Sequence, residues 1–458
     1  MLDQHKKRIE RDSLGDIPLP KHALYGAQTQ RAINNFPVSG QTMPEAFIRA
    51  LLQSKATAAT VNALLQVLPQ EIGKAIHQAV DTLLADKNLM QHFPLDIFQT
   101  GSGTSTNMNA NEVIATLAMQ QSNLPIHPND HVNLGQSSND SIPSTIHISA
   151  AVALSEQLLP ALYHLTEALQ QKANSVNHII KTGRTHLMDA MPIRLSQSLN
   201  AWAAQILINI ENIKQLQPNL QRLAQGGTAV GTGVNAHPDF AKLFCKELSA
   251  ATGVLFVPAD NVFSYISSQD TAVALSGQLK TTAVSLMKIA NDLRWMNSGP
   301  LAGLGEIELE TLQPGSSIMP GKVNPVIPES TAMVAAQVIG NDTSITIAGQ
   351  SGNFELNVML PLIAYNLLNS IQLLSNTCTL LADKAIATFK VNEKSLAQSL
   401  ALNPILATAL NPIIGYEKAA EIAKQAYKER RPIISVAAEQ TELSLEELTT
   451  LLDPKSLV

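Results

Sequence analysis

The chain has 458 residues and a formal net charge of −6 at pH 7, and only 4% of its residues are aromatic. Proteins that bind nucleic acids usually present a basic face and often aromatic rings for stacking, so this composition argues against that class. The charged fraction of 15% is low for a monomer of this size, and we therefore expect broad contacts between subunits.

Neither the cysteines nor the N-terminal segment indicates secretion. Cys245 and Cys378 lie far apart and lack metal-ligand spacing, which is typical of buried thiols in a reducing compartment. The opening segment MLDQHKKRIERD contains acidic residues and has no apolar core for a signal peptide. Because no uninterrupted apolar run reaches membrane length, we expect a soluble, cytoplasmic protein.

Shorter helices separated by polar loops are predicted up to about residue 135, and long helices follow. A long helix is predicted to begin near Pro143, because proline suits the first turn of a helix. Its N-cap is expected among Asn139, Asp140 and Ser141. Another is predicted from about Pro192, until Pro218 kinks or ends it.

The clearest helical pattern begins at Asp270, a plausible N-cap, and continues to about Asn297, which is roughly 40 Å of helix. Its apolar residues recur at steps of three and four and form one stripe: Ala272, Leu275, Leu279, Ala283, Leu286, Ala290 and Leu293. Further helices are predicted from about Pro328 to Gly340 and from Leu360 through Leu380. Such lengths are typical of helical bundles.

The long-helix pattern ends near residue 393, where NPILATALNP precedes a short amphipathic helix, GYEKAAEIAKQAY. We therefore predict an N-terminal helical domain over 1–135, a central bundle over 136–393 and a small helical domain over 394–458. Strand signals are few, and GEIELE at 305–310 is expected to form the arm of a short hairpin.

Four segments rich in hydroxyls, amides and glycine stand between the apolar helices. They are QTGSGTSTNMNANE (99–112), HPNDHVNLGQSSND (127–140), GRTHLMDAMP (183–192) and PGSSIMPGKVNPVIPES (314–330). Each precedes a predicted helix, where unpaired N–H donors and the positive end of the helix dipole attract anions. Helix capping alone explains any one segment, but it is a weaker explanation for four together.

Several common chemistries do not fit these segments. GSSIMPGK has the wrong spacing for a phosphate-binding P-loop, GGTAVGTG (226–233) lacks dinucleotide-binding spacing, and no G-x-S-x-G elbow is present. His127 and His131 are four residues apart, but Pro128 and the following Asn-Asp argue against the helix that a metal pair needs. We therefore expect no metal site.

The remaining chemistry is anion binding combined with proton transfer. Ser316, Ser317, Lys322, Asn324 and His186 carry the suitable groups. A serine hydroxyl becomes an effective base only when N–H donors, a helix dipole or a cation stabilise its alkoxide. The 314–330 loop offers these three kinds of group, which indicates a base that acts on a weakly acidic C–H.

These motifs resemble the class II fumarase family of the aspartase/fumarase superfamily over nearly the whole chain. The specific signature is GSSIMPGKVNP, and QTGSGTSTNMN, HPNDHVN, QSSND, GRTHLMDA and GNFELNV follow the family's pattern. The resemblance implies an all-α fold of three domains with five long central helices. It also implies a homotetramer with a twenty-helix core and active sites shared by three subunits.

The resemblance further implies reversible hydration of fumarate to L-malate without a cofactor. Ser316 would remove a proton from C3 of malate, and Lys322 and Asn324 would stabilise the resulting aci-carboxylate. His186 would deliver a proton to the departing hydroxyl through water, and Glu329 would orient it. The substrate-binding residues implied are Ser102, Gly103, Thr104, Ser137, Ser138, Asn139, Thr185, Ser317, Lys322, Val323 and Asn324. The residues His127, Pro128, Asn129 and Asp130 resemble a secondary anion site.

Two alternatives remain at this point. VIPE after the signature resembles aspartate ammonia-lyase, whereas Gly321 and His186 resemble fumarase; aspartases show alanine and glutamine there. The histidine favours hydration, because a leaving hydroxide needs an acid and an ammonium already carries its proton. A catalytically inert helical scaffold is the alternative of another class, but it would be expected to lose the base, the cation or the acid, and all three are present.

Overall fold

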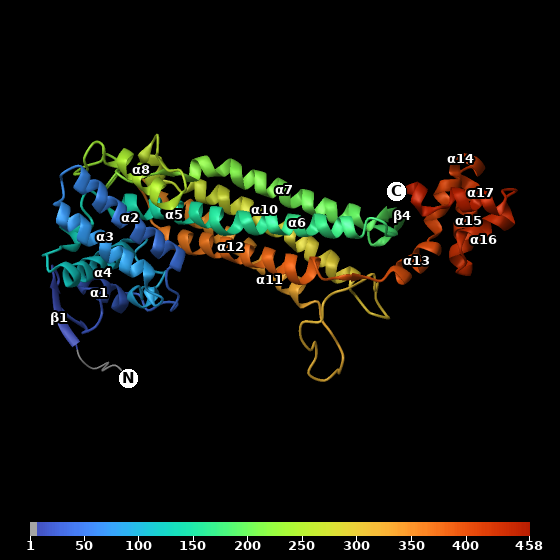
Figure 1. Cartoon of the computed structure of the whole chain (residues 1–458), viewed down its shortest axis with the longest axis horizontal. Coiled ribbons are helices and arrows are strands. Elements are labelled where there is room, and N and C mark those ends of the chain that lie inside the picture. Colours follow the sequence, from blue (N-terminus) through green and yellow to red (C-terminus); the bar gives the residue numbers. More distant parts are fainter. Residues whose placement is uncertain (1–6) are drawn as a thin grey trace. The chain divides into compact units, whose positions relative to one another are not determined.

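The computed structural model describes residues 7–458, and most of these residues are helical (Figure 1). Residues 1–6, part of the segment considered for a signal peptide, lie outside the described residues. The chain divides into two compact units, each built from three segments. The first unit contains the described part of Met1–Pro160 together with Glu211–Ala283 and Ala336–Ser375, and the second contains Ala161–Ile210, Val284–Ala335 and Asn376–Val458.

The helices that lie wholly in the first unit are short to medium in length. They are α1 (Ala27–Asn35), α2 (Glu45–Leu64), α3 (Gln70–Ala85), η1 (Leu89–His92), α4 (Thr104–Ser122), η2 (Pro128–Val132), α5 (Ser138–Ala153), η3 (Leu154–Leu158), α8 (Phe240–Thr252) and α9 (Val262–Ser267). The small strands are antiparallel β1 (Lys7–Asp12) with β2 (Gly15–Pro20), parallel β5 (Arg222–Leu223) with β6 (Val257–Pro258), and antiparallel β8 (Gly352–Asn353) with β9 (Leu356–Asn357).

Five long helices carry the pattern predicted for a bundle. They are α6 (Leu159–Ser175), which continues α5 through the π-helical turn η3, and α7 (Leu195–Leu220), α10 (Asp270–Met296), α11 (Val326–Gly349) and α12 (Leu360–Leu381). The stripe predicted for α10 is buried along its whole length, from Ala272 to Leu293. Since burial of a leucine side chain contributes about 1.5–3 kcal/mol, the leucines of this stripe are a main source of the helix's stability.

Polar side chains hold these helices together inside each unit. In the first unit, Asp342 of α11 accepts hydrogen bonds from Ser276 (2.8 Å) and Lys280 (2.7 Å) of α10. In the second unit, Asn209 of α7 donates to Ser285 of α10 at 3.0 Å, and Lys288 lies 5.4 Å from the ring centroid of Trp202.

The second unit adds two strand pairs and a group of short helices. Strands β3 (Ile180–Thr185) and β4 (Met188–Arg194) form an antiparallel hairpin, and β7 (Ile307–Glu308) pairs with β10 (Lys390–Val391). Helix η4 (Ala382–Ile386) follows α12. The C-terminal elements after it share one apolar core that includes Leu410, Ile422 and Val436; they are α13 (Glu393–Ala401), η5 (Pro404–Leu410), α14 (Asn411–Ile414), α15 (Tyr416–Glu429), α16 (Ile433–Gln440), α17 (Leu445–Leu451) and η6 (Pro454–Leu457).

Several local predictions differ from the structure. Helix α5 is capped by Ser137 instead of a later residue, so Pro143 lies inside it. Residues around Pro192 form strand β4, and α7 begins at Leu195. The strand within GEIELE is not a hairpin arm, because β7 pairs with β10 far along the chain. Pro128 opens a single π-helical turn, where its missing N–H has no helical partner to lose.

Candidate active site

The signature loop, which contains GSSIMPGKVNP (315–325), joins α10 to α11 and extends away from both helices (Figure 1). Its prolines prevent regular helix or strand. The backbone N–H of Gly315 donates to the carbonyl of Lys322 at 2.8 Å, and the Asn324 side chain donates to the carbonyl of Gly315 at 2.7 Å. A Cβ atom at Gly315 would lie 2.6 Å from the Lys322 carbonyl oxygen. We call the place where Gly315 meets Lys322 and Asn324 the neck of the loop. The neck therefore requires glycine at position 315.

Ser316 lies just inside this neck and is half-buried. Its hydroxyl oxygen accepts hydrogen bonds from the backbone N–H groups of Met319 (3.0 Å) and Ile318 (3.3 Å). Two such donors stabilise negative charge on the oxygen, which is the condition set out above for a serine base. The neighbouring Ser317 is exposed, and among the described residues no hydrogen bond of its hydroxyl is found.

The base of the loop and the start of α11 line a cavity of about 750 Å³. Lys322, Val323, Asn324 and Glu329 line it, so the structure brings these predicted site residues together. The Lys322 ammonium donates to the side-chain oxygen of Asn324. Glu329 lies in the first turn of α11, where the helix dipole favours a carboxylate. Ser316 and His186 are not among the lining residues.

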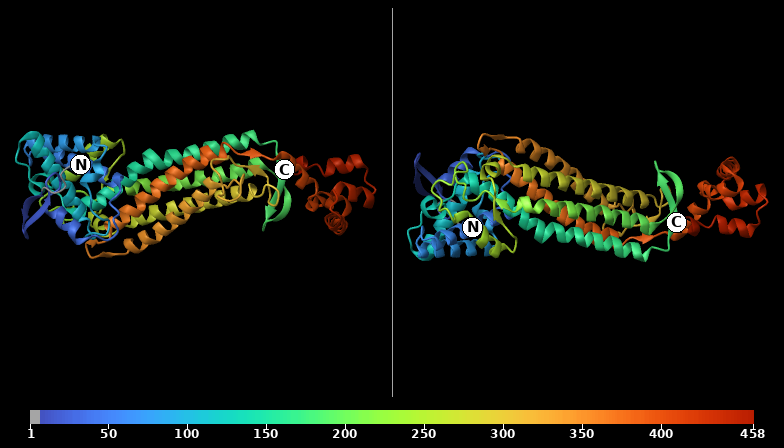
Figure 2. Two further views of the ribbon diagram at one scale, coloured as in Figure 1. Left: turned by 90° about the horizontal axis from the view of Figure 1, so that it is seen from below. Right: turned by 90° about the horizontal axis from the view of Figure 1, so that it is seen from above.

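His186 lies at the tip of the β3–β4 hairpin, which projects from the neighbouring helices of the second unit (Figure 2). Thr185 pairs with Met188, so His186 and Leu187 form a two-residue turn. Both have left-handed backbones, with φ of 56° and 61°. This conformation suits the twist of a hairpin, but it costs about 1–2 kcal/mol per non-glycine residue. Thr185 and His186 are exposed, and no described residue forms a hydrogen bond with either side chain.

Two buried charges and one half-buried charge fix strand β3 of this hairpin. Glu306 accepts from the Lys181 ammonium and forms an ion pair with Arg184 at 2.7 Å. Burial lowers the pKa of Lys181, and the carboxylate of Glu306 opposes that shift. Glu306 precedes β7, so the cluster joins the hairpin that carries His186 to the segment that leads into the signature loop. Sequence reasoning did not single out any of these three residues.

In the first unit, two helix N-termini bring together the remaining hydroxyl-rich residues. Ser102 and Thr104 share a hydrogen bond of 2.8 Å at the start of α4, and Gly103 between them has a φ of 73°. A Cβ atom on Gly103 would lie 2.9 Å from Ile142 of α5, so the close approach of the two helices requires glycine. The predicted residues Ser102 to Thr104 therefore lie beside the first turns of α5.

The start of α5 is fixed by a buried carboxylate. Asp140 accepts from the backbone N–H groups of Ser137 (2.9 Å), Gly226 (3.0 Å) and Thr228 (2.8 Å). Burial raises the pKa of Asp140, whereas these three hydrogen bonds lower it. Asn139 adds a hydrogen bond of 2.8 Å to the carbonyl of Ala229. The glycine-rich segment 226–233 thus braces the Ser137–Asn139 cluster.

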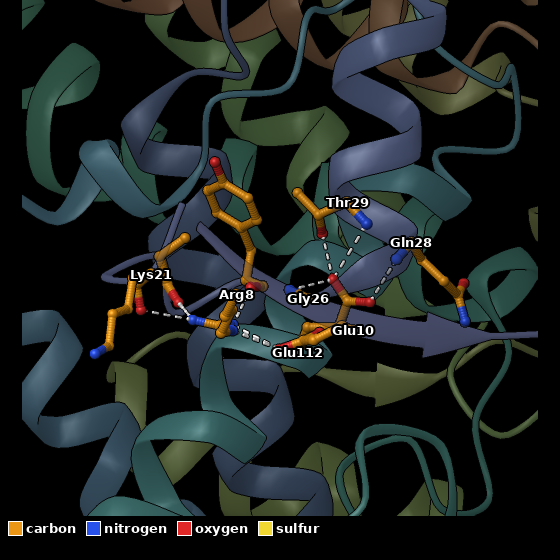
Figure 3. A network of polar contacts seen from close by, with 9 residues as sticks. Arg8, Glu10, Lys21, Gly26, Gln28, Thr29 and Glu112 are labelled. Atoms are coloured by element: carbon orange, nitrogen blue, oxygen red, sulfur yellow. Dashed lines mark hydrogen bonds and ion pairs between the residues drawn. The ribbon is translucent and has the colours of Figure 1, made fainter. Parts of the chain in front are cut away.

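Gly101 and Glu112, both in the first polar segment, have packing and capping roles. Gly101 lies so close to Val358 that a Cβ atom would be 1.7 Å from its carbonyl oxygen. Val358, the last residue of GNFELNV, therefore lies against the loop that precedes α4. Glu112, at the end of the first polar segment, accepts from the backbone N–H groups of Gly26, Gln28 and Thr29 and so caps α1 (Figure 3).

The proposed secondary anion site lies at η2 in the first unit. The ring nitrogen Nδ1 of His127 accepts from the N–H groups of Asn129 (3.3 Å) and Asp130 (3.2 Å). His127, Pro128 and Asn129 line a cavity of about 790 Å³ together with Glu112. Among residues 7–458, which include His127 and His131, no group of three or more His, Cys, Asp or Glu residues is placed to hold a metal ion.

Sequence reasoning also missed Lys55 of α2, which is 0% exposed. Burial lowers its pKa to about 7, and the charge of Asp140 partly opposes this shift. The signal available in the sequence was its position among small and apolar residues. In α2, the residues next to it along the chain are buried as well. Cys245 and Cys378 are buried as predicted, and desolvation raises the pKa of each thiol to about 12.

Two protein-family models match this chain. The lyase family model matches residues 15–340, and the fumarase C C-terminus model matches residues 406–458. The chain, whose fold is built on long helices, is therefore a lyase. No helix among the described residues is long and apolar enough to cross a membrane.

The relatives narrow this class further. The chain is 68% identical to fumarate hydratase class II 2 of Pseudomonas aeruginosa over 98% of both chains. It is 59% identical to fumarate hydratase class II of Xylella fastidiosa, over 100% of this chain and 96% of that one. The crystal structure of a class II fumarase from Schistosoma mansoni matches with a TM-score of 0.95, 37% identity and 99% coverage of both chains. The chain belongs to the class II fumarate hydratase family.

Proposed function

We propose that the chain catalyses the reversible hydration of fumarate to L-malate and that Ser316 is the base. The observation that carries this proposal is the pair of backbone donors on the Ser316 oxygen, at 3.0 and 3.3 Å, inside a loop with the family signature. Identity of 68% to a class II fumarate hydratase over nearly the full length supports the substrate.

In the malate-to-fumarate direction, the Ser316 alkoxide takes a proton from C3, and the C–H electron pair moves into the adjacent carboxylate to form the aci-carboxylate. Lys322 and Asn324 lie at one cavity wall and supply donors for that extra charge. The electron pair then returns to form the C2–C3 double bond while the C2–O bond breaks. Loss of one donor of this type typically raises the barrier by about 2.7–4 kcal/mol.

The departing hydroxyl needs a proton to leave as water. We assign its delivery, through a water molecule, to His186, whose imidazole is exposed on the hairpin tip. Glu329 polarises that imidazole in the assembled site. General acid catalysis of this type contributes about 10²- to 10⁴-fold.

The substrate carboxylates bind at hydroxyl-rich helix starts. Ser102, Thr104, Ser137, Ser138 and Asn139 surround the N-termini of α4 and α5, where N–H groups and the helix dipole favour anions. Gly103, Thr185, Ser317 and Val323 complete the set carried by the family motifs. His127 to Asp130 form a secondary anion site beside the 790 Å³ cavity.

We propose a cytoplasmic homotetramer with a twenty-helix core, in which three subunits contribute to each active site. Large apolar side chains remain exposed on three long helices, including Ile208 (61%), Val284 (54%) and Met333 (68%). Association would bury them, in keeping with the low charged fraction. We also propose the three domains 1–135, 136–393 and 394–458, with breaks where the long helices begin and end.

Two assays on one preparation test the proposal. Malate turnover is followed by the ultraviolet absorption of fumarate, and aspartate turnover by release of ammonia. Hydratase activity without ammonia release is expected. Activity with aspartate alone would instead make the chain an ammonia-lyase, and activity with neither would leave the alternative of an inert scaffold.

A further inference from the structure

The buried cation Lys55 lies behind the proposed carboxylate-binding residues and has no assigned role. Its ammonium donates to the side-chain oxygens of Asn133 (2.8 Å) and Gln136 (3.1 Å). No carboxylate among residues 7–458 contacts it directly, although the charge of Asp140 acts on it. A cation that is removed from water without an ion-pair partner is costly to maintain, and such groups concentrate at functional sites.

A network of amides connects this lysine to Ser138, one of the proposed substrate-binding serines. The Asn133 side-chain oxygen accepts from Lys55 and from the amide nitrogens of Asn107 and Asn111, both at 3.2 Å. The same nitrogen of Asn107 also donates to the hydroxyl oxygen of Ser138 at 3.1 Å. The side-chain oxygens of Asn107 and Asn111 are buried and have no partner among the described residues. Both amides therefore orient their nitrogens toward the Asn133 oxygen at the cost of an unpaired oxygen.

The network leaves the Ser138 hydroxyl hydrogen available. Its oxygen already accepts from Asn107, and Ser138 is 8% exposed, so the side chain is held in place. A hydroxyl that accepts on its inner side donates more readily to an anion on its outer side, because hydrogen bonds in a chain polarise one another. Asn133 also donates to the backbone carbonyl of Gln136 at 3.2 Å, which fixes the loop that precedes α5.

We propose that Lys55 is a positioning residue for substrate binding: through Asn133 and Asn107 it holds the Ser138 hydroxyl toward a substrate carboxylate and places a positive charge behind it. Lys55 does not touch the reacting atoms, so its effect is on the affinity for dicarboxylates and not on the chemical step. This inference rests on the proposed function, since it assumes that Ser138 binds a substrate carboxylate.

The test compares Lys55→Met with the matched control Ser54→Ala. Ser54 is the adjacent buried residue, and within residues 7–458 its hydroxyl bonds only to the carbonyl of Ala50 in its own helix. We expect KM for malate and fumarate to rise about tenfold or more in Lys55→Met, with kcat changed less than about threefold, as expected for loss of a charge-assisted hydrogen-bond network. The inhibition constant of succinate, which cannot react, should rise in parallel. Ser54→Ala should keep wild-type values.

A folded Lys55→Met enzyme with unchanged KM, or with reduced kcat at unchanged KM, would overturn the proposal. If Lys55→Met does not fold, the variant Asn107→Leu tests the proposal instead, because it breaks the link to Ser138 and leaves Lys55 in place. The KM of Asn107→Leu should rise. An unchanged KM would contradict the proposal. Failure of the proposed function can be distinguished from failure of the role proposed for Lys55. If the wild type has no hydratase activity, calorimetric affinities of wild type and Lys55→Met for fumarate still test the role of Lys55.

Discussion

The side-chain amide of Asn324 donates a 2.7 Å hydrogen bond to the backbone carbonyl of Gly315, across the neck of the signature loop. This bond joins the segment that contains the proposed base to the segment that contains the proposed anion-binding lysine. The rest of the loop consists largely of exposed residues, so its shape depends on the neck.

Replacement of Asn324 by alanine removes this bond and one proposed donor to the substrate. We expect kcat to fall about 100-fold or more, because small displacements of positioned groups have effects of this size. Gln313→Ala, an exposed change just outside the neck, is the control. Steady-state kinetics of both variants test this, and an Asn324→Ala enzyme as fast as the control would show that the neck has no catalytic importance.

The left-handed backbone of His186 in the β3–β4 turn determines which substitution can test its imidazole. Asparagine tolerates this conformation, so His186→Asn should keep the fold and lose only the imidazole. We expect kcat for malate dehydration to fall about 100-fold or more. Leu187→Gly, which relaxes the same turn, should remain active. Equal losses in the two variants would attribute the effect to the turn and not to the imidazole.

The buried carboxylate of Glu306 should be important for stability. Glu306→Gln leaves the charges of Lys181 and Arg184 without their partner, and removal of one member of a buried ion pair costs about 3–5 kcal/mol. Thermal unfolding should show a clearly lower midpoint than for Glu310→Gln, which changes an exposed acid in the same segment. Similar midpoints for the two variants would mean that the cluster contributes little.

Lys55 should also give the protein a pH-dependent stability. Its pKa is about 7 in the folded chain and 10.5 in the unfolded chain, so between these values the unfolded chain binds more protons at this site. The unfavourable burial of its charge is therefore complete below pH 7 and is relieved as the pH rises toward 10.5. The midpoint of Lys55→Met minus that of wild type should be more positive at pH 6 than at pH 9. A difference independent of pH would contradict the lowered pKa.

Local sequence signals predicted the presence of the long helices, because their buried stripes are periodic, but α11 continues to Gly349, beyond the predicted Gly340. Helix α10 ends at Met296, next to the predicted Asn297, and α12 matches its predicted span. The start near Pro192 failed because β4 depends on pairing with β3, which local propensity does not encode. The Ser137 cap could have been recognised, since Ser137 and Asp140 have the spacing of a capping box.

The candidate site was only partly predictable for a related reason. Motifs identified the residues of the signature loop, and the structure places Lys322, Asn324 and Glu329 at one cavity. The supporting residues Lys55 and Glu306 carry no motif of their own. Their role arises from long-range contacts, such as that between Glu306 and Lys181, which lie 125 residues apart.

The most direct test of the account is the turnover of L-malate by Ser316→Ala compared with Ser317→Ala, in preparations shown to be equally folded and assembled. We predict that Ser316→Ala loses about 10³-fold or more in kcat, as expected for loss of a catalytic base, while it still binds fumarate, and that Ser317→Ala loses much less. A Ser316→Ala enzyme with kcat close to wild type would contradict the assignment of Ser316 as the base.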